Sequence, residues 1–113
     1  MNCNSVTICD NKLSWLHKLH IQDALAYLGI SGVEVVIDSD TMLEQAYTYL
    51  ESKRVVRIDL SDELTIHDTA LVLAHELVHV KQYVQTPEMP IEQKEQEAYC
   101  QEQIILKILL HGN

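Results

Sequence analysis

The chain lacks the features that define several large classes of protein. Its 113 residues contain only three cysteines, and no apolar stretch approaches the roughly 20 residues that a membrane-spanning helix needs. An odd number of cysteines without paired spacing argues against a disulfide framework and fits free thiols in a reducing compartment. Residues 1–7 carry neither the basic start nor the apolar segment of a secretory signal. The sequence therefore predicts a cytoplasmic protein without a membrane span.

Positive charge is also scarce. Eight Lys and Arg residues stand against 17 Asp and Glu residues, which leaves a formal net charge of −9. Such a surface repels phosphate backbones and anionic lipid headgroups, so neither nucleic acid nor a membrane is an expected partner. The charge balance is a weak indication of neutral or basic polypeptide substrates.

The remaining composition is that of one folded domain. A chain of 113 residues can bury one hydrophobic core, and an apolar content of 47% argues against disorder. There is no internal repeat and no low-complexity segment. We therefore expect a single α+β domain over residues 1–113.

Hydrophobic spacing and turn residues predict the order of the first elements. They are a helix over residues 11–28 that stops at Gly29, a strand over 33–37 closed by a turn at 38–40, a short helical turn from Met42, a strand over 46–50, a hairpin turn at 51–53 and a strand over 56–60. Because strands joined by a tight hairpin are antiparallel, a short and mainly antiparallel sheet is expected.

A further helix follows the hairpin. Thr65 and Asp68 have the spacing of a capping box immediately before an apolar run, so Thr65 is the predicted N-cap. The helix should run to about Gln85, because Pro87 and Pro90 follow it.

A last helix is predicted over about residues 91–110, returning antiparallel to the first. Its final part, residues 104–110, is apolar nearly all round the helix. This pattern predicts partial burial, and the segment could also pair with a second copy in a homodimer.

The helix after Thr65 carries the most informative motif of the chain. Residues 75–79 read His-Glu-Leu-Val-His, an H-E-x-x-H pattern. Residues four apart lie on one face of a helix, so the imidazoles of His75 and His79 can meet at one cation. Zinc accepts imidazole nitrogen at about 2 Å and lowers the pKa of its water toward about 7, and Glu76 can act on that water as general base. The alternative is two neutral, hydrogen-bonded histidines with Glu76 facing water.

A catalytic zinc needs one more protein ligand, and the last helix offers four glutamates. Glu95 lies on the inward face near the helix start. Glu102 is inward as well, but about two turns farther along. Glu97 lies on the other side of the apolar stripe and remains the rival of Glu95, while Glu92 is the remaining candidate.

The motif followed by Glu95-Gln96-Glu97-Ala98 resembles the gluzincin metallopeptidases, particularly their compact forms. The match covers about residues 54–105. This resemblance implies a zincin-like fold in which His75, His79 and Glu95 bind Zn²⁺ and Glu76 is the catalytic base. It also implies a sheet edge that binds extended peptide, which maps to residues 55–59.

The chain departs from that family at two points. Relatives often place Asp or Asn four residues after the ligand glutamate to orient a histidine, whereas this chain has Tyr99. Many relatives also supply a His or Tyr that stabilises the tetrahedral oxyanion. Here His67, Tyr83 and Tyr99 are the candidates for that role.

Together these features predict a zinc metallopeptidase that acts on polypeptides. The motif itself predicts metal-assisted hydrolysis, and the resemblance implies that the bond is a peptide bond. Two alternatives stay open. One is a non-catalytic zinc-binding module, and the other is a latent peptidase whose zinc is covered by the acidic segment 88–97 or by the C-terminus.

Overall fold

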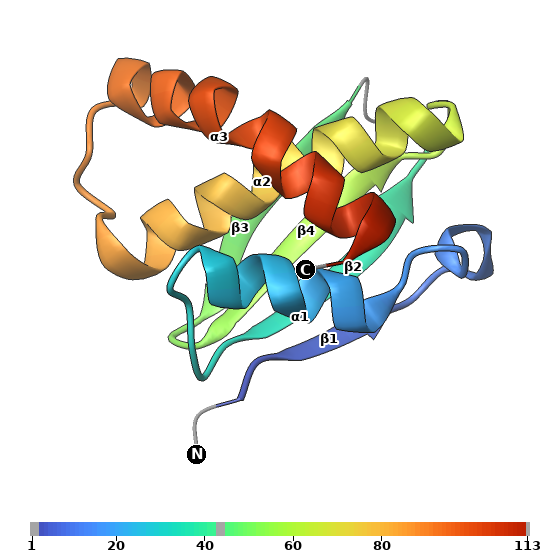
Figure 1. The fold of residues 1–113 in the computed structure, drawn as a ribbon, viewed down its shortest axis with the longest axis horizontal. Helices are drawn as coiled ribbons and strands as arrows, with labels where there is room; N and C mark the ends of the chain where they lie inside the picture. The colour runs from blue at the N-terminus through green and yellow to red at the C-terminus, as the bar shows by residue number, and fades with distance from the viewer. Residues whose placement is uncertain (1–2, 43–44, 113) are drawn as a thin grey trace.

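The computed structural model describes residues 3–42 and 45–112. In these residues a four-stranded sheet is covered on one face by helices (Figure 1). The elements in chain order are β1 (Ser5–Ile8), a 3₁₀ turn η1 (Asn11–Leu13), α1 (Lys18–Tyr27), β2 (Glu34–Asp40), β3 (Ala46–Ser52), β4 (Val55–Ser61), α2 (Ile66–Gln85) and α3 (Ile91–His111). The predicted α+β class is confirmed.

The sheet has the strand order β1-β2-β4-β3. β1 pairs with β2 and β2 pairs with β4 in parallel, whereas β3 and β4 are antiparallel. The prediction of a mainly antiparallel sheet is therefore wrong. β1 was not predicted, because it is short and half polar. A parallel pairing also joins segments that no tight turn connects, so it leaves no local signal in the sequence.

β2 is longer than predicted. Residues 38–40 were expected to form a turn, but the strand continues to Asp40. Arg57 of β4 donates from Nη2 to Asp38 Oδ2 at 2.7 Å and from Nε to Asp59 Oδ1 at 3.2 Å. The polar end of β2 stays in the sheet because the neighbouring strand supplies an ionic partner for it.

β3 and β4 form the predicted hairpin, but with a shifted turn. The turn falls at residues 53–54 instead of 51–53. A register shift between Leu50 and Ser52 accommodates the additional strand residue. The helical turn predicted just after Met42 lies outside the described residues.

The first helix is shorter than the predicted span of residues 11–28. Asp10 accepts a hydrogen bond at 2.8 Å from a backbone N–H two residues on, which starts the isolated turn η1. His17 is extended, so α1 begins only at Lys18. Leu16 is buried although it is not helical. Apolar residues at helical spacing can therefore reach the core from an irregular segment.

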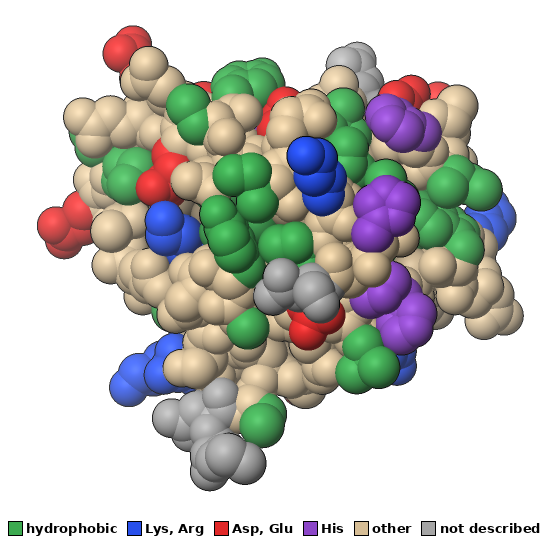
Figure 2. Space-filling view, in the orientation of Figure 1, with side chains coloured by type: hydrophobic (Ala, Val, Ile, Leu, Met, Phe, Trp, Pro, Cys, Tyr) green, Lys and Arg blue, Asp and Glu red, His purple; other side chains and the backbone are tan. Residues whose placement is uncertain are grey.

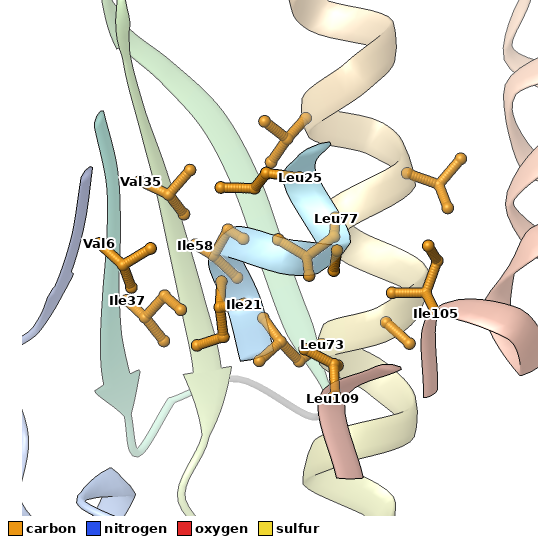
Figure 3. Packing of buried hydrophobic residues seen from close by; sticks show 14 of the residues in the cluster. Val6, Ile21, Leu25, Val35, Ile37, Ile58, Leu73, Leu77, Ile105 and Leu109 are labelled. Carbon is orange, nitrogen blue, oxygen red and sulfur yellow. The ribbon is translucent and has the colours of Figure 1, made fainter. Parts of the chain in front are cut away.

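The molecule has three layers. α1 and α2 lie on the sheet, and α3 packs on α1 and α2 from the far side (Figure 1). α3 runs opposite to α1, and His20 Nδ1 of α1 lies 3.1 Å from the carbonyl oxygen of Leu109 near the end of α3. Figure 3 shows the resulting core, in which strand residues face helix residues: Val6, Val35, Ile37, Ile58, Ile21, Leu25, Leu73, Leu77, Ile105 and Leu109.

The apolar C-terminal run of α3 is explained mostly by this core. Four of its residues are buried, namely Ile105, Leu106, Ile108 and Leu109. Ile104 and Leu110 remain 43% and 42% exposed. Figure 2 shows hydrophobic side chains on this face of the molecule in several separate groups. The homodimer stays a prediction. No helix in the described ranges is both long and apolar enough to cross a membrane.

Thr65 is the N-cap of α2, as predicted. Its Oγ1 accepts the backbone N–H of Asp68 at 3.1 Å, which satisfies one of the free amide groups at the helix start.

We expect Thr65→Ala to lower the free energy of unfolding by about 1 kcal/mol, measured as a lower urea midpoint with an unchanged slope. Thr65→Ser keeps the hydroxyl and is the matched control. Equal losses in both variants would show that the hydroxyl is not what stabilises the helix.

Candidate metal centre

α2 presents the three polar residues of the motif to two different neighbours. His75 and His79 face α3, with ring centroids 4.9 Å apart and side chains only 15% and 14% exposed. Glu76 faces β3 and is 9% exposed. A helix turns by about 100° per residue, so adjacent residues point to different neighbours while residues four apart share one.

Glu95 of α3 meets both histidines. Its Oε2 lies 3.0 Å from His75 Nε2, and its Oε1 lies 3.1 Å from His79 Nε2. One potential ligand atom from each of the three residues lies within 4.8 Å of the others, and no further such group occurs in the described ranges. Two ligands of a tetrahedral zinc, each at about 2 Å, are roughly 3.3 Å apart. Two imidazoles and one carboxylate at this spacing could hold a metal ion.

Glu102 holds the other nitrogen of His75. His75 Nδ1 lies 2.9 Å from Glu102 Oε2, and the Glu102 side chain is 17% exposed. A carboxylate on Nδ1 favours the tautomer whose Nε2 is free for a metal. Glu102 was predicted only as a possible ligand, and its contact with His75 Nδ1 was not predicted. Glu102 lies two helical turns after Glu95, which puts both side chains on the same face of α3. This spacing is the signal that the sequence offers.

Gln82 holds the other nitrogen of His79 in the same way. His79 Nδ1 lies 2.7 Å from Oε1 of Gln82, which is only 1% exposed. Gln82 Nε2 donates to the carbonyl of Lys94 and to Glu97 Oε1, both at 2.9 Å. The sequence analysis missed Gln82, although a polar residue one turn after His79 on a largely buried helix is a signal.

Glu97 therefore lies in a different place from Glu95. It accepts hydrogen bonds from Gln82 and, at 3.1 Å, from Lys81 Nζ. The bond from Gln82, followed by Lys81, holds the pKa of Glu97 below its usual value. The geometry favours Glu95 over Glu97 as the third ligand, because Glu97 is not a member of the group that faces the two histidines.

Glu76 does not face bulk water. The hydroxyl of Thr48 on β3 donates to Glu76 Oε1 at 2.6 Å, and both side chains are buried. This bond occupies one carboxylate oxygen and sets the orientation of the other. The arrangement differs from the alternative in which Glu76 is a solvated surface residue.

Two hollows adjoin the group. The larger, of about 410 Å³, lies between β3, α2 and α3 and is lined by Ala46, Tyr47, Thr48, Glu76, His79, Gln82, Tyr83, Ile91, Lys94 and Glu95. The smaller, of about 190 Å³, is lined by Gln45, Leu71, Val72, His75, Glu76, Tyr99 and Glu102. Glu76 is a lining residue of both hollows.

The free edge of the sheet runs beside the larger hollow. The prediction that residues 55–59 form this edge is wrong, because β4 lies between β2 and β3. Gln45 accepts the amide of Ser61 directly opposite it, and antiparallel residues alternate in direction. The backbone groups of Ala46 and Thr48 therefore point away from β4, toward the open edge.

The three oxyanion candidates lie in different surroundings. Tyr83 lines the larger hollow, and its hydroxyl donates to the Thr48 carbonyl at 3.1 Å. Burial, and then the nearby Tyr47 and Glu76, raises the pKa of Tyr83, so its phenol keeps its proton at neutral pH. Tyr99 lies on the smaller hollow beside His75. His67 is 69% exposed and lies 3.8 Å from Asp68.

The two segments proposed as covers of the zinc lie in different places. The acidic segment 88–97 contributes three of its wall residues, Ile91, Lys94 and Glu95. At the C-terminus, Gly112 lies beside the His20 ring, against α1. The described residues therefore show the acidic segment as a wall of the site.

Comparison with protein-family models, curated proteins and solved structures finds no match to this chain.

The ligand set is tested by metal analysis of matched glutamate variants. We expect His75→Ala and Glu95→Gln to lose bound zinc, because each removes a donor atom of the group. We expect Glu97→Gln to retain zinc, and Glu102→Gln to bind it about 10- to 100-fold more weakly because His75 loses its orienting partner. Calorimetric titration of apoprotein with zinc measures these affinities. Loss of zinc in Glu97→Gln together with retention in Glu95→Gln would reverse the choice of ligand.

Proposed function

We propose that this chain is a small zinc-dependent metallopeptidase of the compact gluzincin kind. In this proposal His75, His79 and Glu95 hold Zn²⁺. The observation that carries it is the convergence of both histidine Nε2 atoms on one carboxylate of α3, with Glu76 fixed immediately beside them. Each histidine also has an oriented second nitrogen, which is typical of metal-binding imidazoles.

The chemistry divides between the ion and the protein. A zinc ion bound there supplies a Lewis acid and acidifies water. Glu76 takes a proton from the attacking water and delivers it to the leaving amine, which is the work of a general base followed by a general acid. Thr48 holds one oxygen of Glu76 and leaves the other for the proton. Tyr83 keeps its proton, and by exchanging its hydrogen bond to the Thr48 carbonyl it can donate to the developing oxyanion.

The substrate we propose is an extended polypeptide. The outward backbone groups of Ala46 and the outward N–H of Thr48 allow a peptide to add to the edge of β3 as a further strand, whereas the Thr48 carbonyl accepts a hydrogen bond from Tyr83. The peptide would then cross Glu76, with the larger hollow on one side and the smaller, partly apolar hollow on the other. We propose the cytoplasm as its location, since Cys3, Cys9 and Cys100 are exposed free thiols.

Replacement of the proposed base separates an enzyme from a non-catalytic zinc module. We expect Glu76→Gln to keep zinc and to lower peptide cleavage by at least about 10²-fold, because the variant cannot accept the proton. The measurement is cleavage of an unfolded protein beside the metal content of the same sample. Chelation should stop the wild type, and added zinc should restore it. Wild-type zinc protein that cleaves nothing, with unchanged partner binding in Glu76→Gln, would favour the module.

Removal of the Tyr83 hydroxyl tests its proposed role. We expect Tyr83→Phe to lower kcat on the order of 10²-fold with little change in KM, because the donor acts on charge that develops in the transition state. Tyr99→Phe is the matched control and should leave kcat near that of the wild type. A loss confined to Tyr99→Phe would move the oxyanion site to the smaller hollow.

A further inference from the structure

Lys94 is the cation in the wall of the larger hollow. It lies on α3 immediately before Glu95, and its ammonium is 5.5 Å from the centre of the Tyr83 ring. The backbone carbonyl of Lys94 accepts a hydrogen bond from the buried Gln82, which ties this part of α3 to α2. The position of Lys94 is therefore set by the same contacts that position His79.

Lys94 differs from the other basic residues near the site in having no carboxylate partner. Lys81 is paired with Glu97 at 3.1 Å, and Arg57 is paired with Asp38 and Asp59. Within residues 3–42 and 45–112, Lys94 enters no ion pair. Lys94 is the one Lys or Arg among the described residues that line this hollow; the others are aromatic, apolar, acidic or neutral polar residues and His79.

With a divalent cation bound, the formal charges of the acidic and basic residues that line this hollow sum to a positive value. Glu76 and Glu95 contribute two negative charges, which the cation balances, and Lys94 then adds one positive charge. Two further carboxylates lie close by: Glu97 is paired with Lys81, and Glu102 lies 2.9 Å from His75 Nδ1, on the side of that ring away from Glu95. Charges beyond about 8 Å are largely screened at physiological ionic strength, so at Lys94 itself the local charge and the net charge of −9 favour opposite kinds of peptide.

The surroundings of Lys94 strengthen a contact with an anion. Tyr47, Tyr83 and Ile91 line the same hollow, and a bound peptide would exclude water between them. A hydrogen bond between an ammonium and a carboxylate is stronger than a neutral one, and partial desolvation increases its contribution.

We propose that Lys94 makes this cleft selective for peptides that carry a carboxylate at the Lys94 end. The carboxylate is either an acidic side chain or the free C-terminus of the peptide. The inference rests on the proposed function only in that it takes the cleft beside Thr48 to bind extended peptide. It reverses the expectation of neutral or basic substrates, which came from the net charge alone.

The test measures binding and cleavage separately. Fluorescent peptides with Glu, Gln or Lys at successive positions, each with a free or an amidated C-terminus, are titrated into zinc-loaded Glu76→Gln protein. We expect the best Glu peptide to bind about tenfold more tightly than its Gln counterpart. A preference that survives amidation identifies an acidic side chain, and one that requires the free terminus identifies a terminal carboxylate.

Variants of Lys94 in the same Glu76→Gln background show whether the selectivity comes from this residue. Lys94→Gln should remove the preference, Lys94→Arg should keep it, and Lys94→Glu should reverse it in favour of Lys peptides. Lys107→Glu is the matched control. It makes the same change of net charge on an exposed position of the same helix, away from both hollows, and should behave like the parent.

The outcomes separate this inference from the proposed function. Carboxylate selectivity that depends on Lys94, in a protein that cleaves nothing, would support the site and reject the peptidase. Cleavage by the wild type with equal affinity for Glu, Gln and Lys peptides would support the peptidase and overturn the role of Lys94. An equal shift in Lys107→Glu and Lys94→Glu, or no peptide binding at all, would also overturn it.

Discussion

The candidate centre depends on the packing of α3 across α2. Two histidines and a glutamate on a mostly buried helix carry a desolvation cost unless other polar groups meet them. α3 supplies those groups as Glu95 and Glu102, and it can do so because the apolar residues farther along it, Ile105 and Leu109, are buried against the rest of the molecule. The same helix therefore closes the core at one end and completes the polar site at the other.

Most of the contacts that orient the motif come from outside it. Thr48 holds Glu76, Glu102 holds His75, and Gln82 holds His79 while it is itself bonded to Glu97. A buried polar network of this kind stabilises one geometry only when each member finds a partner. The network also explains why two glutamates that lie close in the sequence of α3 have different contacts. Glu95 faces the histidines, whereas Glu97 faces Gln82 and Lys81.

The sheet topology determines which strand edge lies beside the larger hollow. Because β4 inserts between β2 and β3, the hairpin leaves β3 at the edge, with the outward backbone groups of Ala46 and Thr48 beside the larger hollow. Thr48 thus contributes a side chain to the proposed base and a main chain to the proposed peptide site. Lys94 and Tyr83 also line that hollow, so the strand edge, the proposed base and the proposed selectivity residue surround one space.

The sequence by itself determined the features that depend on residues close together in the chain. These are the helical period that puts His75 and His79 on one face, the N-cap at Thr65, and the hairpin before the motif helix. The choice between Glu95 and Glu97 stayed open in the sequence, because a helical wheel does not say which side of a stripe meets a neighbour. Only the tertiary structure decided which glutamate faces the two histidines, that β1 and β2 pair in parallel, and which strand forms the edge of the sheet. Each of these is a contact between segments far apart in the chain, and such contacts leave no periodic signal in the residues that make them.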